Sequence, residues 1–186
     1  MNTLPYSVRG DAVKFDEAGS GIKLLLLDVD GVLTDGSILV NGSSEEFKRF
    51  NVKDGLGLKL LQANGVEVAL VSGRESGSTA RRARELGIGE VHQGSYDKAA
   101  VCRRLIEERG LGRGEICAVG DDILDMAMFR LSGVTFAVAD AVEEVRAAAD
   151  AVLDKPGGAG AIRDVCEWIL RGKGKWESIV SGFNQE

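Results

Sequence analysis

The chain has 186 residues, of which 44% are hydrophobic and 28% are charged, and this suits one compact domain with a substantial core rather than two full domains. Its formal net charge of −6 argues against an overall positive field that would recruit nucleic acid or an anionic membrane. An anionic substrate would therefore need a local basic pocket.

The predicted elements alternate between apolar, strand-like runs and helical patterns after a weakly patterned N-terminal segment. The predicted strands are 24–30, 66–73, 90–94, 115–121, 134–140 and 150–154, and the predicted helices are 55–64, 75–86, 97–109, 123–131 and 142–149. Strands and helices that alternate in this way predict an α/β fold, a Rossmann-like parallel sheet with right-handed crossovers and helices on both faces.

Three segments lie outside this alternation. Residues 37–50 contain two short β-prone arms around Asn41-Gly42, a strong hairpin signal directly after the first strand. Residues 1–21 read as a loosely ordered arm, and residues 172–186 read as a flexible tail because they show no clear period. We therefore expect one domain over residues 22–171 with a projecting hairpin.

The three cysteines predict a protein kept in a reducing compartment. Cys102, Cys117 and Cys166 are far apart and lack the paired spacing of a metal or redox motif, so we expect buried thiols. The N-terminal segment lacks the apolar core of a secretion signal, and no window approaches the ~18 apolar residues of a membrane span. We expect a cytoplasmic protein.

Polar residues follow several predicted strands at their carboxyl ends, where doubly wound sheets bind ligands. They are Asp28, Asp30, Ser72, Gly73, Arg74, Asp121 and Asp122. Lys98 joins them at the start of a helix, where a cation gains nothing from the helix dipole. Several carboxylates beside one hydroxyl and one ammonium make a poor structural cluster, but they suit a magnesium and phosphate site.

The carboxylates suggest phosphoryl transfer. Asp28 and Asp121 would hold Mg²⁺, which relieves the repulsion between Asp28 and Asp30. Asp28 would attack phosphorus, and Asp30 would protonate the leaving oxygen and later activate water. A lone D-x-D, however, is usually a turn or a helix cap, and Asp125 taken alone suits a solvated helix face equally well.

The phosphate would be held from the other side of the site. The Ser72 hydroxyl, the backbone N–H groups of Gly73 and Arg74, and the Lys98 ammonium are suitable donors for phosphoryl oxygens. Each of these features is weak by itself, and the prediction depends on their occurring together.

Four motifs in this order resemble those of the haloacid dehalogenase superfamily of aspartyl-phosphate enzymes. They are D-V-D-G-V at 28–32, Ser72 after an apolar strand, Lys98, and G-D-D-x-x-D at 120–125. The resemblance implies Asp28 as the nucleophile, Asp30 as the acid/base and Ser72 and Lys98 as phosphate ligands. It also implies a metal bound by Asp28, the backbone carbonyl of Asp30 and Asp121, with support from Asp122 or Asp125.

Longer runs, among them DVDGVLTDGSILVNG, FNVKDGLGLKLL and VGDDILD, resemble the 3-deoxy-D-manno-octulosonate 8-phosphate phosphatases. This implies a capless, magnesium-dependent homotetramer of lipopolysaccharide sugar synthesis. The implied contacts to the sugar acid are Asn51, Lys53, Asp54, Gly55, Arg74 and Arg82. One departure from the family pattern leaves the identity of the sugar open, because Ala159 stands where the pattern G-G-R-G-A has Arg.

The spacing of the motifs independently favours a capless protein. The segments from Asp30 to Ser72 and from Ser72 to Lys98 are filled by a predicted hairpin, helix or strand, which leaves no room for a lid domain. Without a lid domain, another part of the protein would have to select the substrate and exclude water from the site. The apolar hairpin residues 38–40 would pack against another subunit. We expect a closed homo-oligomer whose neighbouring subunits wall each site.

Other functions fit less well. Response-regulator receivers also combine acidic residues, Ser or Thr and Lys, but their accepting Asp follows the third strand, whereas here D-x-D follows the first. A non-catalytic partner domain would tolerate loss of Asp28 or Asp30, and both are present. Among phosphatases, the alternative substrates are a nine-carbon sialic-acid-type phosphate or a broad range of small phosphomonoesters.

Overall fold

The computed structural model describes residues 5–40 and 46–183, and its centre is a mostly parallel sheet with the strand order β1-β9-β8-β7-β2-β5-β6. The strands are β1 (Tyr6–Val8), β2 (Leu24–Leu27), β5 (Glu67–Val71), β6 (Glu90–His92), β7 (Ile116–Gly120), β8 (Val134–Ala137) and β9 (Ala151–Leu153). All neighbouring strands are parallel except β1, which pairs antiparallel with β9 at the edge. This confirms the predicted fold class.

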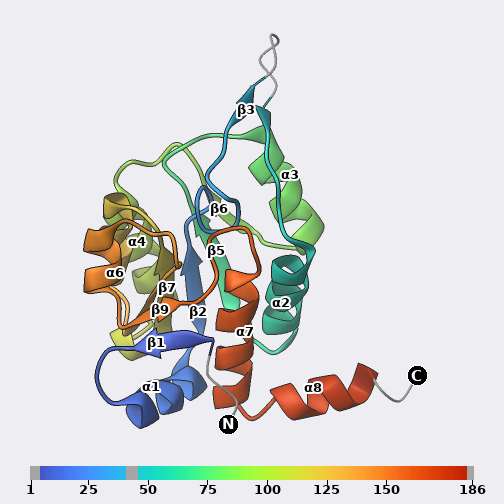
Figure 1. Cartoon of the computed structure of the whole chain (residues 1–186), viewed down its shortest axis with the longest axis vertical. Coiled ribbons are helices and arrows are strands. Elements are labelled where there is room, and N and C mark those ends of the chain that lie inside the picture. The colour runs from blue at the N-terminus through green and yellow to red at the C-terminus, as the bar shows by residue number, and fades with distance from the viewer. Residues whose placement is uncertain (1–4, 41–45, 184–186) are drawn as a thin grey trace.

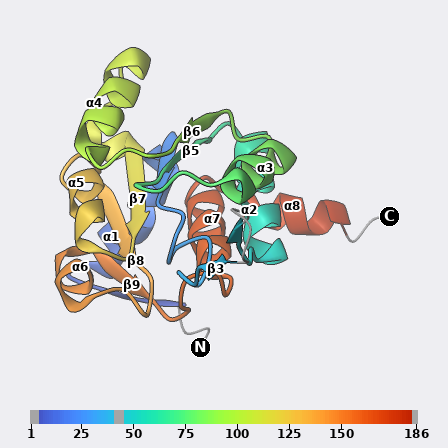
Figure 2. The ribbon, with the colours of Figure 1, turned by 90° about the horizontal axis from the view of Figure 1, so that it is seen from above.

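The helices lie in two layers on the two faces of the sheet (Figures 1 and 2). They are α1 (Ala12–Ala18), α2 (Val52–Ala63), α3 (Gly77–Leu86), α4 (Lys98–Arg109), α5 (Met126–Phe129), α6 (Glu143–Ala148), α7 (Ala161–Gly172) and α8 (Trp176–Phe183). Helices α2, α3 and α7 cover one face, and α4, α5 and α6 cover the other (Figure 2). No described helix is both long and apolar enough to cross a membrane.

The chain reverses its direction across the sheet at β2. From β2 it moves outward through β5 to β6, and then it returns to β7 on the other side of β2. Such a switch point opens a crevice at the carboxyl ends of the central strands, where ligands bind in folds of this kind. The topology therefore places the ends of β2 and β7 side by side.

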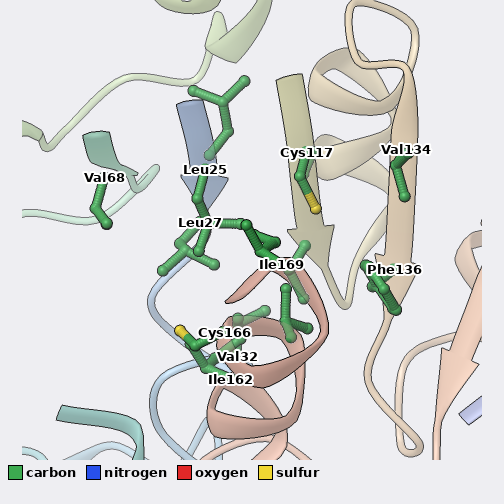
Figure 3. Packing of buried hydrophobic residues seen from close by; sticks show 14 of the residues in the cluster. Leu25, Leu27, Val32, Val68, Cys117, Val134, Phe136, Ile162, Cys166 and Ile169 are labelled. Carbon is green, nitrogen blue, oxygen red and sulfur yellow. The ribbon is translucent and has the colours of Figure 1, made fainter. Parts of the chain in front are cut away.

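The leucine run of β2 is buried because the strand is central and covered on both faces. Leu24 to Leu27 each have 0% exposure, and β2 pairs with β5 on one side and β7 on the other. Figure 3 shows Cys166 and Ile169 of α7 packed below Leu27. Full burial of each leucine stabilises the fold by about 1.5–3 kcal/mol, so the strand that leads to the site is firmly anchored.

The N-terminal segment is more ordered than its composition indicated. Strand β1 extends the sheet, and α1 packs against α7 through Phe15, whose ring lies 5.0 Å from the Trp168 ring and 5.3 Å from the Phe136 ring. The Tyr6 hydroxyl and the Trp168 indole N–H both donate to Asp16, at 2.9 and 3.2 Å. These aromatic contacts have no local periodicity, so the sequence pattern did not reveal them.

The C-terminal segment, which we expected to be flexible, contains helix α8. Its first residue, Trp176, is 8% exposed, and the guanidinium groups of Arg163 and Arg171 lie over its ring, at 5.0 and 5.3 Å from the ring centroid. Cation–π contacts of this kind fix the start of the helix against α7. The remainder of α8 extends away from the domain (Figure 1).

The hairpin projects from the domain next to the carboxyl ends of the strands (Figure 1). Its arms, β3 (Leu39–Val40) and β4 (Glu46–Phe47), pair antiparallel as predicted. The predicted turn at Asn41-Gly42 lies outside the described residues. Leu39, Val40 and Phe47 are 60%, 76% and 55% exposed, so the arms carry an apolar surface into solvent.

The loop after β9 packs directly against the loop after β2. The Gly158 N–H donates to the Val32 carbonyl at 3.0 Å, and a Cβ atom on Gly157 would lie 1.7 Å from the Gly31 carbonyl oxygen. Only glycine permits this approach, because the obstructing atoms are backbone. The loop after β9 therefore supports the loop after β2, which carries the first acidic motif.

We predict that Gly157→Ala destabilises the protein by about 1–3 kcal/mol, because the new methyl group must push two backbone segments apart. Gly89→Ala is the matched control, since its Cβ would have no neighbour within 4 Å and its φ is not left-handed, and we expect a change within about 0.5 kcal/mol. Urea denaturation measures both. Equal stability of the two variants would contradict the close packing.

Candidate active site

The predicted acidic residues meet at the carboxyl ends of two neighbouring strands. Asp28 directly follows β2, and Asp121 directly follows β7, which pairs with β2. Lys98 opens α4 and reaches Asp28 from that helix, and Figure 2 looks onto this end of the sheet. The structure thus brings together side chains that are far apart in sequence.

Lys98 joins two of the carboxylates. Its Nζ lies 2.7 Å from Asp28 Oδ1 and 2.6 Å from Asp125 Oδ1, and all three side chains are buried. Burial alone would lower the pKa of Lys98, but the two carboxylates raise it above its usual value, so the ammonium stays charged. One fixed positive charge therefore holds Asp28 in place.

Asp125 organises the turn after β7 and is not on a solvated face. Its Oδ2 accepts hydrogen bonds from the backbone N–H groups of Asp121 and Asp122, at 2.9 and 3.2 Å. Asp122 is the helix cap, because its Oδ1 accepts from the Ile123 N–H at 2.7 Å. Asp125 therefore holds the turn after β7 from a buried position, and Asp122 caps the short helical turn that follows; a supporting role in catalysis stays a prediction for both.

The remaining features of the cluster suit a hard divalent cation. Asp28, Asp121 and Asp125 each have a carboxylate oxygen within 4.8 Å of the others, and Asp121 Oδ1 is buried without a partner. Burial, followed by the charges of Asp28 and Asp125, raises the pKa of Asp121 well above its usual range. Gly31 leaves space for this carboxylate, since a Cβ there would lie 2.0 Å from Asp121 Oδ2.

Asp30 has a partner that the sequence analysis missed. Its Oδ1 lies 2.6 Å from the Nζ of Lys48, whose side chain is completely inaccessible, while its Oδ2 is buried without a partner. Lys48 also lies 3.3 Å from Glu46, which in turn pairs with Arg74 at 2.8 Å. The available signal was the alternation of Glu46, Phe47 and Lys48, which places the two charged residues on one side of the hairpin arm.

Ser72 lies at the same edge of the sheet, after β5. The register pairs Leu27 with Leu70, so the residues that follow β2 and β5 are neighbours. Ser72 is 2% exposed; its hydroxyl donates to the Arg74 carbonyl and accepts from the Arg74 N–H, at 3.1 and 3.2 Å. The Arg74 N–H, which we expected to donate to a phosphoryl oxygen, therefore donates to Ser72 within the turn. Gly73 borders the exposed side chain of Tyr96.

The loop before α2 contains the other candidate substrate residues. Asn51 caps α2 by accepting from the Lys53 N–H at 2.8 Å, and its amide donates to the Gly158 carbonyl at 3.4 Å. Lys53 is exposed. A contact between either residue and a substrate stays a prediction.

Asp54 is used inside the protein. It is 1% exposed, and its oxygens accept from the backbone N–H groups of Gly160 and Arg163 at 3.3 and 2.7 Å. A carboxylate at the start of α7 is stabilised by the free N–H groups and the dipole of that helix. Asp54 therefore ties α2 to the start of α7.

Arg82 packs against α2 at Gly55. A Cβ on Gly55 would lie 2.3 Å from Arg82 Nη2, so glycine makes room for the guanidinium. Arg82 also lies over the Phe50 ring at 5.9 Å and bonds Glu85 at 3.3 Å. Its side chain is 22% exposed, against 45% for Arg74, so both keep some access to solvent.

Comparison with known proteins shows the family to which the chain belongs. Residues 84–162 match the model of the haloacid dehalogenase-like hydrolases. The chain is 41% identical over 154 residues to the 3-deoxy-D-manno-octulosonate 8-phosphate phosphatase of Haemophilus influenzae, covering 83% of this chain and 86% of the relative. Its identity to the Escherichia coli K12 enzyme of the same name is 39%, covering 83% and 82%.

Solved structures agree. The phosphatase of the same name from Moraxella catarrhalis, in complex with a magnesium ion, a phosphate ion and KDO, superposes with a TM-score of 0.90 at 36% identity, covering 93% of this chain and 99% of that one. The cobalt-bound Haemophilus influenzae enzyme gives a TM-score of 0.85 at 38% identity, covering 90% and 99%. With this likeness along most of its length, the chain belongs to the 3-deoxy-D-manno-octulosonate 8-phosphate phosphatase family of haloacid dehalogenase-like hydrolases.

Proposed function

We propose that the chain is a magnesium-dependent phosphatase that hydrolyses 3-deoxy-D-manno-octulosonate 8-phosphate through an aspartyl-phosphate on Asp28. The observation that carries the proposal is the buried Asp28 carboxylate held by Lys98 beside Asp121, with Asp30 close by in sequence. The names of the relatives and the KDO and phosphate in the Moraxella catarrhalis structure support the choice of substrate.

In the first step, a carboxylate oxygen of Asp28 attacks phosphorus, and the bond between phosphorus and the sugar oxygen breaks. The protonated Asp30 carboxyl gives its proton to that leaving oxygen, which departs as the sugar hydroxyl. Lys98 holds Asp28 in position for attack, because its short contact with Oδ1 restricts rotation of the carboxylate.

In the second step, the Asp30 carboxylate takes a proton from a water molecule whose oxygen attacks the phosphorus. The bond between phosphorus and Asp28 breaks, inorganic phosphate leaves, and both aspartates return to their starting states. Asp28, Asp121 and the backbone carbonyl of Asp30 would hold Mg²⁺, which neutralises phosphoryl charge when it is bound. Ser72, the Gly73 backbone and Lys98 would steady the other oxygens of the phosphoryl group.

Arg74 and Arg82 would recognise the sugar carboxylate. Both retain solvent access, whereas Lys98 and Lys48 are buried and already paired with carboxylates. A guanidinium can donate two parallel hydrogen bonds to a carboxylate. Ala159, exposed in the loop before α7, gives no side chain that could hydrogen-bond a sugar, and this keeps a nine-carbon sugar acid phosphate as the second candidate substrate.

We further propose that the chain forms a closed homo-oligomer, a tetramer by its resemblance, and works in the cytoplasm. The exposed apolar arms of the hairpin and the exposed Tyr96, Ile123 and Leu124 near the site favour contact with neighbouring subunits. The three cysteines are buried and free, which suits a reducing compartment.

The proposed activity is tested by measuring phosphate release from a panel of sugar acid phosphates, with Mg²⁺ and with EDTA. We expect 3-deoxy-D-manno-octulosonate 8-phosphate to have the highest kcat/KM and EDTA to abolish turnover. Asp28→Asn should reduce kcat by roughly 10⁴-fold or more, because an amide cannot attack phosphorus. Wild-type turnover by Asp28→Asn would contradict the mechanism, and activity that survives EDTA would contradict the metal.

For the arginines, we predict that Arg74→Ala and Arg82→Ala each raise KM for the sugar acid phosphate by about 10-fold or more, because each variant loses a charged hydrogen bond to the sugar carboxylate. The KM for a small phosphate ester without a carboxylate should change little. Steady-state kinetics on both substrates measures the difference. Equal losses on the two substrates would mean that the arginines serve the fold or the phosphate alone.

For the assembly, sedimentation at micromolar protein should give one species several times the 19.8 kDa mass of the chain. Replacing Leu39, Val40 and Phe47 together by Ser should shift it towards monomers, because the apolar surface of the hairpin arms would be lost. These monomers should lose selectivity for the sugar acid while still cleaving a generic phosphate ester. A fully active wild-type monomer would refute the assembly.

A further inference from the structure

We propose that Lys48 is a positioning residue for Asp30, which it orients so that one carboxylate oxygen alone exchanges the catalytic proton. The inference rests on the proposed phosphatase function. Lys48 lies in the arm of the hairpin, outside all four motifs that resemble the superfamily, and neither the mechanism nor the comparisons assign it a role.

The two oxygens of Asp30 have different surroundings. Oδ1 accepts from Lys48 Nζ at 2.6 Å, and Oδ2 is buried with no protein partner. A lysine ammonium is only a donor, so the contact favours an unprotonated oxygen at Oδ1. The transferred proton is then carried on Oδ2, and the Lys48 contact restricts rotation of the carboxyl group.

Lys48 is itself held at a fixed place. Its side chain is fully inaccessible, and a lysine buried in this way needs charged partners to offset its desolvation. Glu46 supplies the second carboxylate, at 3.3 Å, and is anchored by Arg74 and by the Ser78 hydroxyl, which donates to the Glu46 backbone carbonyl at 2.8 Å. The ammonium is therefore part of an ordered ion network.

This network links the acid/base to the arm of the hairpin. Arg74, the proposed ligand of the sugar carboxylate, pairs with Glu46. Glu46 in turn contacts Lys48, and Lys48 pairs with Asp30.

The chemistry of the step is unchanged. Asp30 Oδ2 gives its proton to the departing sugar oxygen as the phosphorus–oxygen bond breaks, and it recovers a proton from the attacking water. Lys48 contributes orientation and no proton.

The test uses two substrates with different leaving groups. p-Nitrophenyl phosphate releases a stable anion that needs no proton, whereas the sugar phosphate releases an alcohol that does. With Lys48→Met, rapid mixing should show a burst of one p-nitrophenolate per site at close to the wild-type rate, followed by slow turnover. The sugar phosphate should show no burst and a kcat reduced by about 10²-fold, the lower end of general acid–base catalysis, with KM changed little.

Three further variants complete the comparison. Asp30→Asn should show the same pattern as Lys48→Met, because both remove a correctly placed proton donor. Lys48→Arg should recover part of the lost kcat, since a guanidinium can also donate to Oδ1. Arg49→Met is the matched control, because Arg49 neighbours Lys48 but pairs with Asp35 and not with Asp30, and its side chain is 76% exposed, so it should keep wild-type kinetics.

The outcomes separate the two proposals. If wild-type protein cleaves p-nitrophenyl phosphate but not the sugar acid phosphate, the assigned substrate is wrong, and the comparison is made with another primary alkyl phosphate that the protein cleaves. If wild-type protein cleaves both and Lys48→Met slows the two phosphorylation steps equally, Lys48 serves only the fold, and the positioning role is overturned. Kinetics of Lys48→Met equal to wild type would overturn it as well.

Discussion

The contact of the Lys98 ammonium with Asp28 and Asp125 is the interaction on which the rest of the site depends. Buried carboxylates repel one another and lose hydration, so this cluster could not persist at the end of an apolar strand without an opposing charge. Lys98 supplies that charge from α4, and Asp125 passes the constraint to the turn after β7 through two backbone hydrogen bonds. One cation thus fixes Asp28, the proposed nucleophile, and the turn that carries Asp121 relative to each other.

The sheet and the main acidic cluster could be predicted because their signals are local. A four-leucine run predicts a central strand, and polar residues at strand ends predict a shared edge when the strands are parallel. Asp28, Asp121 and Lys98 accordingly lie where the pattern placed them. The motif positions also carried the family resemblance, since phosphoryl transfer needs those residue types at those strand ends.

The parts that escaped prediction depend on contacts between distant segments. The role of Lys48 requires the hairpin arm to fold back onto Asp30, and a lone lysine in a charged stretch normally indicates a solvated surface. Asp54 reads as a surface carboxylate near a helix start, yet it caps α7 more than a hundred residues later. Trp176 looked like part of a tail without a pattern because its partners, Arg163 and Arg171, belong to another helix.

The close packing of Gly157 and Gly158 against the loop of Gly31 and Val32 has a consequence for how the protein is made. Asp28 is synthesised well before the loop that packs against its own loop and before the start of α7 that Asp54 caps, because these lie more than a hundred residues later in the chain. A nascent chain whose residues 157–163 are still inside the ribosomal exit tunnel therefore carries the first acidic motif without the backbone contacts that support it.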